Sequence, residues 1–127
     1  MKSKIVIAGS RSVPQIFLWY ARIDKLLVNL SQYEKEIISG GARGADTVGE
    51  MYAKERGYKL TVIKPEWDKY GKKAGFIRNK QMIDYACTEG ALPLLIAIWD
   101  GKSKGTQHTI NLAKQANIDY RIIPHPL

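Results

Sequence analysis

The sequence predicts an α/β protein, a three-layer Rossmann-like domain with a mostly parallel five-stranded sheet and helices on both faces. Three observations lead to this prediction. Apolar, strand-like runs alternate strictly with helix-like segments, which is typical of a parallel sheet with crossover helices. The run Pro93–Trp99 is continuously apolar, as in a strand buried on both faces. Glycine-bearing loops follow apolar runs, and in open α/β sheets such loops meet at the carboxyl edge of the strands.

Five strands and four helices are expected, in alternation. The predicted strands are Lys4–Ala8, Glu36–Ser39, Lys59–Ile63, Pro93–Trp99 and Asp119–Ile123. The predicted helices are Pro14–Leu30, Ala45–Arg56, Ala74–Thr88 and Thr106–Gln115, the first of which has apolar residues at spacings of three and four. Ser12 before Pro14 has the arrangement of an N-cap followed by a first-turn proline, and Gly57 that of a C-terminal cap. Residues 66–74 have no clear period.

The composition is that of one globular domain, residues 1–127, with enough chain to bury a single core. Apolar content of 45% and charged content of 25% are ordinary and do not indicate disorder. No apolar run approaches the roughly 20 residues of a membrane span, and the first apolar stretch is too short for a signal peptide. The single cysteine, Cys87, excludes an internal disulfide, favours a cytoplasmic location, and is expected to be a small buried hydrophobe.

The formal net charge is +8, from 20 basic and 12 acidic side chains. Such an excess favours anionic partners, either nucleotides or a nucleic-acid backbone, and does not choose between them. No cluster of His, Cys and carboxylate residues has the spacing of a metal site, so neither a metal nor another cofactor is expected.

Four glycine-bearing loops are the candidate ligand-binding elements, and each of them carries arginine or lysine. Glycine lets the backbone approach a ligand closely, and free N–H groups at the start of the following helix attract anions. The loops are Gly9–Ser12, Gly40–Asp46, Gly71–Gly75 and Gly101–Thr106. Together they predict a site for a phosphate-bearing molecule.

The first loop offers Ser10, Arg11 and Ser12 to a phosphate, through hydroxyls, backbone amides and a guanidinium that can grip two oxygens. The alternative is that Ser12 only caps a helix and that Arg11 is solvated. Asp46 in the second loop has two readings as well, because a carboxylate there either caps the helix or accepts a hydrogen bond from a ribose hydroxyl.

The second loop nearly matches the dinucleotide-binding fingerprint, with Ser39, Gly41 and Gly44 at its three glycine positions. It follows the second strand rather than the first, so ordinary NAD binding is not implied. The fourth loop fails as a Walker A motif because Ile96 occupies a required glycine position, although Gly105-Thr106 at a helix start forms a good anion nest.

Two further candidates lie outside the strand-end loops. Arg78 and Asn79 are expected about one turn into the third helix, where an arginine is either a surface charge or a ligand contact. Trp67 and Tyr70 could stack a base, although core packing is the commoner use of aromatic residues.

One ordered set of motifs runs through almost the whole chain: Gly9-Ser10-Arg11-Ser12, Gly40-Gly41-Ala42-Arg43-Gly44-Ala45-Asp46, Trp67, Tyr70-Gly71-Lys72-Lys73-Ala74-Gly75, Arg78-Asn79, Met82, Trp99-Asp100-Gly101, Ser103 and Gly105-Thr106. This set resembles the YspA-type (YpsA-related) branch of the SLOG superfamily. The resemblance implies a Rossmann-like fold and a nucleotide-derived ligand held by the same loops, in a sensor or processor of nucleotide derivatives.

The superfamily also contains the LOG phosphoribohydrolases, which implies a second hypothesis, an N-glycosidic-bond hydrolase or transferase acting on nucleoside phosphates. Arg78 matches the arginine of the LOG motif, whereas Asn79 stands at its lysine and Thr109 at its glutamate. Because cleaving an N-glycosidic bond usually requires a placed carboxylate, this replacement argues against LOG-type hydrolysis. Arg78 remains a catalytic candidate. The carboxylates that could substitute are Asp46, Asp100 and Asp68.

A third hypothesis is a single-stranded nucleic-acid-binding module, because the superfamily includes the DNA-processing protein DprA, which binds single-stranded DNA. The charge of +8 favours this class. Against it, the basic residues concentrate in glycine loops and do not alternate with aromatic residues as in strand-binding grooves.

The predicted partner is therefore a small nucleotide-derived ligand: a nucleotide, a nucleotide-sugar or an ADP-ribose-like molecule. The predicted ligand-binding residues are Gly9, Ser10, Arg11, Ser12, Gly40, Gly41, Arg43, Gly44, Asp46, Trp67, Arg78, Asn79, Asp100, Gly101, Ser103, Gly105 and Thr106. Residues 17–20, Phe-Leu-Trp-Tyr, cover more than one helix face, which favours a homodimer or higher homo-oligomer unless all four are intramolecular core.

Overall fold

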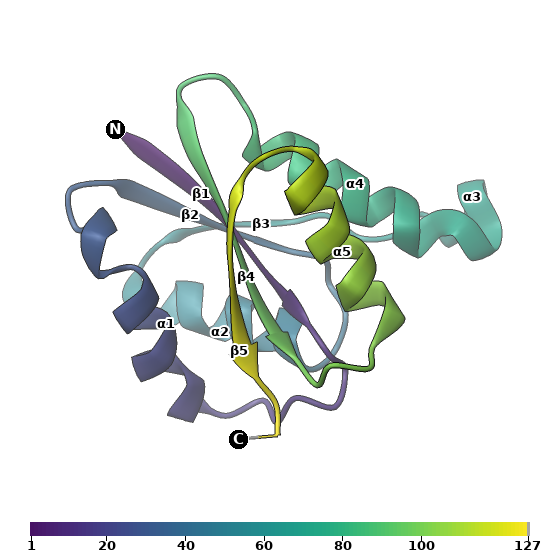
Figure 1. Ribbon diagram of the computed structural model, residues 1–127, viewed down its shortest axis with the longest axis horizontal. Coiled ribbons are helices and arrows are strands. Elements are labelled where there is room, and N and C mark those ends of the chain that lie inside the picture. The colour runs from purple at the N-terminus through teal and green to yellow at the C-terminus, as the bar shows by residue number, and fades with distance from the viewer. Residues whose placement is uncertain (127) are drawn as a thin grey trace.

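The computed structural model describes residues 1–126 and confirms the predicted α/β class (Figure 1). The strands are β1 (Lys2–Gly9), β2 (Glu34–Ser39), β3 (Lys59–Val62), β4 (Ala91–Trp99) and β5 (Asp119–Pro124). The helices are α1 (Tyr20–Leu26), α2 (Ala45–Arg56), α3 (Trp67–Tyr70), α4 (Ala74–Ala86) and α5 (Lys104–Gln115). Three short 3₁₀ turns are η1 (Phe17–Trp19), η2 (Val28–Leu30) and η3 (Gly71–Lys73). Within residues 1–126, no helix is long and apolar enough to cross a membrane.

The sheet has the strand order β3-β2-β1-β4-β5, and every neighbouring pair is parallel. The central strand β1 pairs with β4 along its whole length, from Lys2 opposite Ala91 to Gly9 opposite Ile98. The chain builds outward from β1 to β3 and then returns to β4, so the direction of winding reverses between β1 and β4. Open α/β sheets bind ligands outside the carboxyl ends of the strands at this kind of reversal.

Two hydrophobic clusters, one on each face of the sheet, make the three layers. Successive strand residues point to opposite faces, so Ile5 and Ile7 of β1 pack with α1 and α2, whereas Val6 and Ala8 pack with α4 and α5. Figure 1 shows the two pairs of helices on opposite sides of the sheet. Residues 94–98 of β4 are buried throughout, which confirms that this apolar run is a strand covered on both faces.

The predicted helix Pro14–Leu30 is wrong in its first turn and at its end. The chain is extended at Ile16, turns through η1, forms the short helix α1, and ends in η2. Ser12 therefore caps no helix, and its hydroxyl lies 3.3 Å from Nε2 of His125. A spacing of three and four residues fits successive short helical turns as well as one continuous helix, which is why the pattern misled.

The aromatic stretch at η1 divides between the core and the surface. Trp19 is 2% exposed and its indole N–H donates a hydrogen bond to the carbonyl oxygen of Pro14 at 2.8 Å. Phe17 and Leu18 are exposed, so the four apolar residues are not all intramolecular core.

Two other expectations fare differently. Gly57 adopts a left-handed conformation with φ of 71°, and the helix before it, α2, spans the predicted residues. Cys87, expected to be buried, is exposed because α4 ends one residue before it. Residues 67–73 form α3 and η3, two short turns that precede α4 and lie beyond its N-terminal end, away from the sheet (Figure 1).

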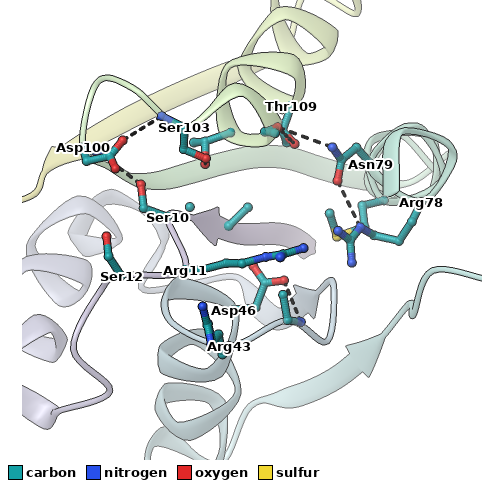
Figure 2. Close-up of a pocket in the computed structure, with 16 residues that line it drawn as sticks. Ser10, Arg11, Ser12, Arg43, Asp46, Arg78, Asn79, Asp100, Ser103 and Thr109 are labelled. Carbon is teal, nitrogen blue, oxygen red and sulfur yellow. Dashed lines mark hydrogen bonds between the residues drawn. The ribbon is translucent and has the colours of Figure 1, made fainter. Parts of the chain in front are cut away.

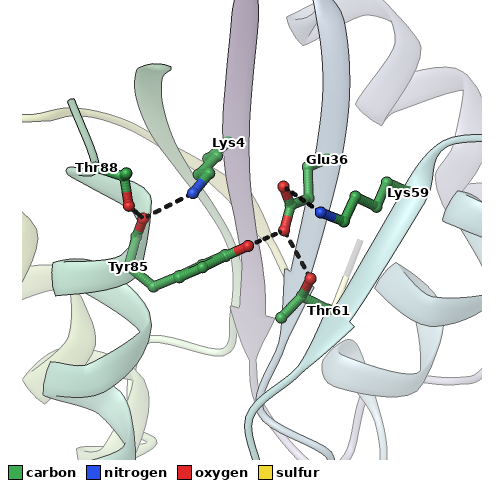
Figure 3. A network of polar contacts seen from close by, with 6 residues as sticks. All are labelled: Lys4, Glu36, Lys59, Thr61, Tyr85 and Thr88. Carbon is green, nitrogen blue, oxygen red and sulfur yellow. Dashed lines mark hydrogen bonds and ion pairs between the residues drawn. The ribbon is translucent and has the colours of Figure 1, made fainter. Parts of the chain in front are cut away.

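A polar network on the α4 face joins three strands to α4 (Figure 3). Glu36 of β2 accepts hydrogen bonds from the hydroxyls of Thr61 and Tyr85, both at 2.6 Å, and Nζ of Lys59 lies 3.7 Å away. Nζ of Lys4 lies 3.7 Å from the centre of the Tyr85 ring. Burial alone would raise the pKa of Glu36, but these hydroxyls and lysines outweigh it and hold the pKa below its usual value. The network attaches the C-terminal half of α4 to the sheet.

The end of β1 leaves no room for a side chain. A Cβ added to Gly9 would lie 2.0 Å from the carbonyl oxygen of Ile98 and 2.8 Å from the Cβ of Ala45. Both are parts of the packed scaffold, since Ile98 belongs to β4 and Ala45 begins α2. Glycine at this position therefore allows β1, β4 and α2 to meet.

We predict that Gly9→Ala lowers the free energy of unfolding by about 1–3 kcal/mol or more, because backbone must move to admit the methyl group. Gly75→Ala is the matched control. Gly75 lies within α4, and a Cβ added there would lie 3.8 Å from Trp67, which is an ordinary contact distance. Gly75→Ala should therefore change the free energy of unfolding by no more than about 1 kcal/mol, in the stabilising direction. Urea unfolding of the three proteins measures both effects, and equal stabilities for Gly9→Ala and the parent protein would contradict the prediction.

Candidate functional site

A cavity of about 500 Å³, the first cavity, opens at the carboxyl edge of the sheet (Figure 2). Its walls come from the loops after β1, β2 and β4, from the first turns of α2 and α5, and from α4. It contains most of the predicted ligand-binding residues: Gly9, Ser10, Arg11, Ser12, Arg43, Asp46, Arg78, Asn79, Asp100, Ser103, Gly105 and Thr106. Segments far apart in the sequence thus meet where the winding of the sheet reverses.

The remaining predicted residues lie elsewhere. Gly41 and Trp67 line a neighbouring cavity of about 530 Å³, the second cavity. Gly40, Gly44 and Gly101 line neither cavity. The predicted loop Gly71–Gly75 also lines neither, because it follows the helical turn α3 and not the end of a strand. Sequence reasoning missed these lining residues: Ala8, Ala42, Met82 and Thr109 in the first cavity, and Lys64 and Pro65 in the second.

Ser10 joins the loops on the two sides of the first cavity. Its N–H donates to the carbonyl oxygen of Ile98 at 2.9 Å, and its own carbonyl oxygen accepts from the N–H of Ala45 at 3.2 Å. Its side-chain oxygen accepts from the N–H of Asp100 at 3.1 Å. The buried Ser10 therefore fixes the end of β1 against both β4 and the start of α2.

Asp46, in the first turn of α2, is the buried acid of the site, with a side chain that is 5% exposed. Its Oδ2 accepts a hydrogen bond from the N–H of Ala42 at 3.1 Å. Burial raises the pKa of Asp46 to about 6, although the Ala42 N–H and the charges of Arg78 and Arg11 favour the carboxylate. Near neutral pH this group can therefore accept a hydrogen bond as a carboxylate or donate one as an acid.

Arg78 and Asn79 of α4 link the loop after β2 to the start of α5. Nη1 of Arg78 donates to the carbonyl oxygen of Gly40, and its Nε donates to Oδ1 of Asn79 at 3.0 Å. The amide of Asn79 in turn donates to the carbonyl oxygen of Gly105 at 3.4 Å. Arg78 is only 9% exposed, and burial lowers its pKa, but a guanidinium stays charged at neutral pH.

The third nitrogen of Arg78 is free for a ligand. Nη2 makes no hydrogen bond with any of residues 1–126, and no side-chain nitrogen or oxygen within that part of the chain is both fully buried and unpaired. Nη2 must therefore reach open space, and Arg78 lines both cavities.

Arg11 and Arg43 are exposed, and their guanidinium groups have no ion pair among residues 1–126. Figure 2 shows Arg11 extending across the first cavity toward Arg78, beside Asp46. Three guanidinium groups thus surround a cavity that contains two carboxylates, Asp46 and Asp100. The balance of charge favours an anionic ligand.

Asp100 shapes the loop before α5. Its Oδ1 accepts hydrogen bonds from the N–H groups of Lys102 and Ser103, both at 2.8 Å, and these hold its pKa below the usual value. Ser103 is the residue before the first turn of α5, and Thr106 donates to its hydroxyl oxygen at 3.1 Å. The first N–H groups of a helix have no partner within the helix and carry partial positive charge, so the turn containing Gly105 favours an anion.

The second cavity adjoins the first. Both are lined by Arg11, Ala42, Arg43 and Arg78, which we call the shared wall. Lys64, Pro65 and Trp67 line the second cavity alone. Trp67 is 52% exposed, so core packing does not account for this aromatic residue.

Neither a metal cluster nor a LOG-type carboxylate is found in the part of the chain that the structure describes. No group of three or more His, Cys, Asp or Glu residues could hold a metal ion among residues 1–126. Thr109, at the position of the LOG glutamate, lines the first cavity and donates its hydroxyl to the carbonyl oxygen of Gly105 at 3.2 Å. Asp68 lines neither the first nor the second cavity.

Comparison with known proteins agrees with the motifs. Residues 3–70 match the YspA, cpYpsA-related SLOG family. The chain is also 31% identical over 121 residues to the Gene 61 protein of Mycobacterium phage D29, an alignment that covers 91% of each protein. The chain belongs to the YspA, cpYpsA-related SLOG family.

Among solved structures, this SLOG chain is similar to DNA processing protein A (DprA) from Streptococcus pneumoniae. The TM-score is 0.68 at 22% sequence identity, with 100% of this chain aligned. The SLOG chain spans 52%, about half, of the DprA chain. At this identity the likeness establishes the shared fold.

Asp46 gives stability a pH dependence of known sign. The pKa of Asp46 is about 6 in the folded protein, whereas 3.8 is the ordinary pKa of an aspartate side chain in water, so the folded state binds the proton more tightly. Its contribution is therefore most favourable at low pH and is lost as the pH rises from about 4 to about 6. As the pH rises through this window, the parent protein should lose this contribution and Asp46→Asn should not. We predict that the free energy of unfolding of Asp46→Asn rises by up to about 3 kcal/mol relative to that of the parent protein, at 1.36 kcal/mol for each pKa unit.

Urea unfolding of Asp46→Asn and the parent protein from pH 4 to pH 7.5 measures this difference. Groups that titrate in both proteins cancel when the two curves are subtracted. A difference that stays constant with pH would contradict the raised pKa of Asp46.

Proposed function

We propose that this protein is a cytoplasmic sensor or processor that binds a phosphate-bearing, nucleotide-derived ligand in the first cavity. The observation that carries the proposal is the convergence of Arg11, Arg43 and Arg78 on one polar cavity at the carboxyl edge of the sheet. One guanidinium group can donate two parallel hydrogen bonds to two oxygens of a phosphate. A bound anion among the three arginines would also relieve the repulsion between their positive charges. Membership of the SLOG family supports the same ligand class.

Each part of the cavity has a role in this proposal. Nη2 of Arg78 and the exposed side chains of Arg11 and Arg43 would contact phosphate oxygens. The first turn of α5, at Gly105, would add backbone N–H groups and the favourable end of the helix dipole. The carboxyl group of Asp46 would accept a hydrogen bond from a ribose hydroxyl.

A second candidate function is hydrolysis or transfer at the N-glycosidic bond of a nucleoside phosphate. The specific observation in its favour is Asp46, a buried carboxyl with a pKa of about 6 beside Arg78. A raised pKa suits a general acid at neutral pH. Thr109 at the position of the LOG glutamate weighs against it, as does the use of Oδ1 of Asp100 within its own loop.

A third candidate, single-stranded nucleic-acid binding, is supported by the net charge of +8 and by the fold shared with a DNA processing protein. It makes a distinct prediction, since binding through phosphate contacts weakens steeply as salt increases. An interaction with oligonucleotides that is undetectable or insensitive to salt would remove this candidate.

The direct test is to incubate the purified protein with a panel of nucleotides, NAD and ADP-ribose and to identify bound and released species by mass spectrometry. An intact retained compound supports the sensor, and a released base or sugar phosphate supports the hydrolase. Retention of no member of the panel would contradict nucleotide binding.

For the retained compound, we predict that Arg11→Ala lowers affinity by about tenfold or more, since it removes a charge-assisted hydrogen bond. The Arg11 side chain is exposed and makes no ion pair among residues 1–126, and its charge favours the Asp46 carboxylate but repels Arg78, so the variant should unfold at a urea concentration close to that of the parent. Arg22→Ala is the matched control, because Arg22 is also an exposed arginine, on α1, and lines neither cavity. Equal affinities for Arg11→Ala and Arg22→Ala, measured by titration calorimetry, would exclude Arg11 from the site.

A further inference from the structure

We propose that His108 of α5 is a positioning residue that acts on Arg78 through Asn79. While the imidazole of His108 is neutral, it holds the amide of Asn79 in the orientation that supports Arg78, and protonation of the imidazole releases Arg78. We call these three side chains the relay. The relay itself is independent of any ligand, whereas its effect on ligand affinity rests on the proposed function.

The relay is a chain of hydrogen bonds through the side-chain amide of Asn79. Its Oδ1 accepts from Nε of Arg78 at 3.0 Å. Its Nδ2 lies 3.4 Å from the carbonyl oxygen of Gly105 and 3.3 Å from Nδ1 of His108. Figure 2 shows Asn79 between Arg78 and the first turn of α5. An amide nitrogen has two N–H groups, so both donors of Asn79 are engaged.

The groups at two of these contacts determine the direction of every hydrogen bond in the relay. Nε of Arg78 can only donate, so the atom that faces it must be the amide oxygen of Asn79. The carbonyl oxygen of Gly105 can only accept, so the atom that faces it must be the amide nitrogen. The same nitrogen faces Nδ1 of His108, which must therefore accept and carry no proton. His108 is accordingly neutral, with its proton on Nε2.

Protonation of His108 is incompatible with this arrangement. A protonated imidazole carries a proton on both nitrogens, so Nδ1 would present a donor to the N–H groups of Asn79. The amide can offer its oxygen to His108 only by turning over. Its N–H groups would then face Nε of Arg78, which also donates, and that hydrogen bond would be lost.

Two features favour the turned amide over a displaced imidazole. The ring of Phe76 packs edge-on against that of His108, with ring centroids 4.7 Å apart and an angle of 61° between the planes, and restricts its rotation. A hydrogen bond from a cationic imidazole to the amide oxygen is also about twice as strong as a neutral one. Arg78 would then keep one hydrogen-bond partner among residues 1–126, the carbonyl oxygen of Gly40.

His108 acts on the site indirectly. It is half-buried and lines neither cavity, whereas Asn79 lines the first cavity and Arg78 lines both. Burial lowers the pKa of His108 from its ordinary value, so the neutral form predominates at neutral pH. The relay should therefore be intact at neutral pH and should open in mildly acidic solution, below about pH 6.5.

The strands under α5 place no charge against His108. α5 packs against β1, β4 and β5 as well as α4, and β4 has no charged residue. On this face of the sheet, Nζ of Lys4 of β1 lies over the ring of Tyr85. Tyr120 of β5 lies under Nζ of Lys114.

The helices also leave His108 without an ion pair. Lys80 and Asp84 of α4 pair with each other at 2.6 Å. Lys104 begins α5, one turn before His108, and is exposed. Among residues 1–126, no carboxylate lies within ion-pair distance of His108. Arg78 is therefore the charged group to which His108 is linked by hydrogen bonds, through Asn79.

NMR spectroscopy of the ligand-free protein tests the relay directly. At pH 7.5 the ¹⁵N chemical shifts of His108 should show a bare Nδ1 and a protonated Nε2. As the pH falls to 5, the Nε–H resonance of Arg78 and the amide resonances of Asn79 should change together with the protonation of His108. In His108→Asn this change should disappear, because the new amide oxygen can accept in place of Nδ1 and does not titrate.

Asp46 must be separated from His108 in this titration, because its pKa is about 6 and its charge acts on Arg78. Asp46→Asn should keep the part of the Arg78 titration that follows His108, and His108→Asn should keep the part that follows Asp46. Arg56 is the internal reference. Its Nε also donates to a side-chain oxygen, Oδ1 of Asp24 at 3.1 Å, and its resonance should not follow His108.

Titration calorimetry with the nucleotide retained from the panel measures the effect on the site. His108→Leu should weaken binding by about threefold at pH 7.5, because Asn79 loses an acceptor, and the conservative variant His108→Asn should restore the affinity. At pH 5, His108→Asn should bind about threefold more tightly than the parent. A positive charge on His108 would by itself strengthen anion binding by the parent, so weaker binding identifies the release of Arg78.

Two NMR results would overturn the relay whether or not a nucleotide binds. One is a proton on Nδ1 of His108 at pH 7.5, and the other is a set of Arg78 and Asn79 resonances that do not follow the protonation of His108. Equal affinities of the parent and His108→Asn at pH 5 would overturn the effect on the site. Retention of no nucleotide would contradict the proposed function, and the NMR titration would still decide the relay.

Discussion

The close contact of β1 with β4 at Gly9 is the constraint on which the candidate site depends. Only glycine fits there, because the carbonyl oxygen of Ile98 occupies the place of a Cβ. The next residue, Ser10, then hydrogen-bonds both β4 and the start of α2, and its side-chain oxygen accepts from the N–H of Asp100. Loops that follow three different strands are thereby held around one cavity. Their flexible cationic side chains can move, while the backbone that carries them is fixed by the sheet.

The opposite wall is held by a buried arginine. Arg78 is satisfied on one side by the carbonyl oxygen of Gly40 and by Asn79, and no carboxylate lies within ion-pair distance among residues 1–126. A buried cation without an ion pair costs stability, as does an acid such as Asp46 whose pKa is raised by burial. Local features that lower stability without an evident structural gain are expected at functional sites, and here they occur together. A bound anion would supply the missing negative charge.

Sequence reasoning could predict the fold because its signals are local. The ends of α2 were predictable, since Gly57 is a typical C-terminal cap, and the apolar run in β4 was readable from composition alone. The site was predictable in outline because parallel strands bring their carboxyl ends to one edge. Contacts made by distant segments could not be read in this way. The helix expected from Pro14 breaks into short turns, and Pro65 reaches the second cavity only through the fold of the chain after β3.

The central claim is that arginines from two loops and a helix hold phosphate at the carboxyl edge of the sheet. A crystal structure of the protein with the tightest-binding nucleotide of the panel tests it most directly. The account predicts phosphate oxygens within hydrogen-bond distance of Nη2 of Arg78 and of the Arg11 guanidinium. A nucleotide bound elsewhere, with its phosphates away from both arginines, would contradict it.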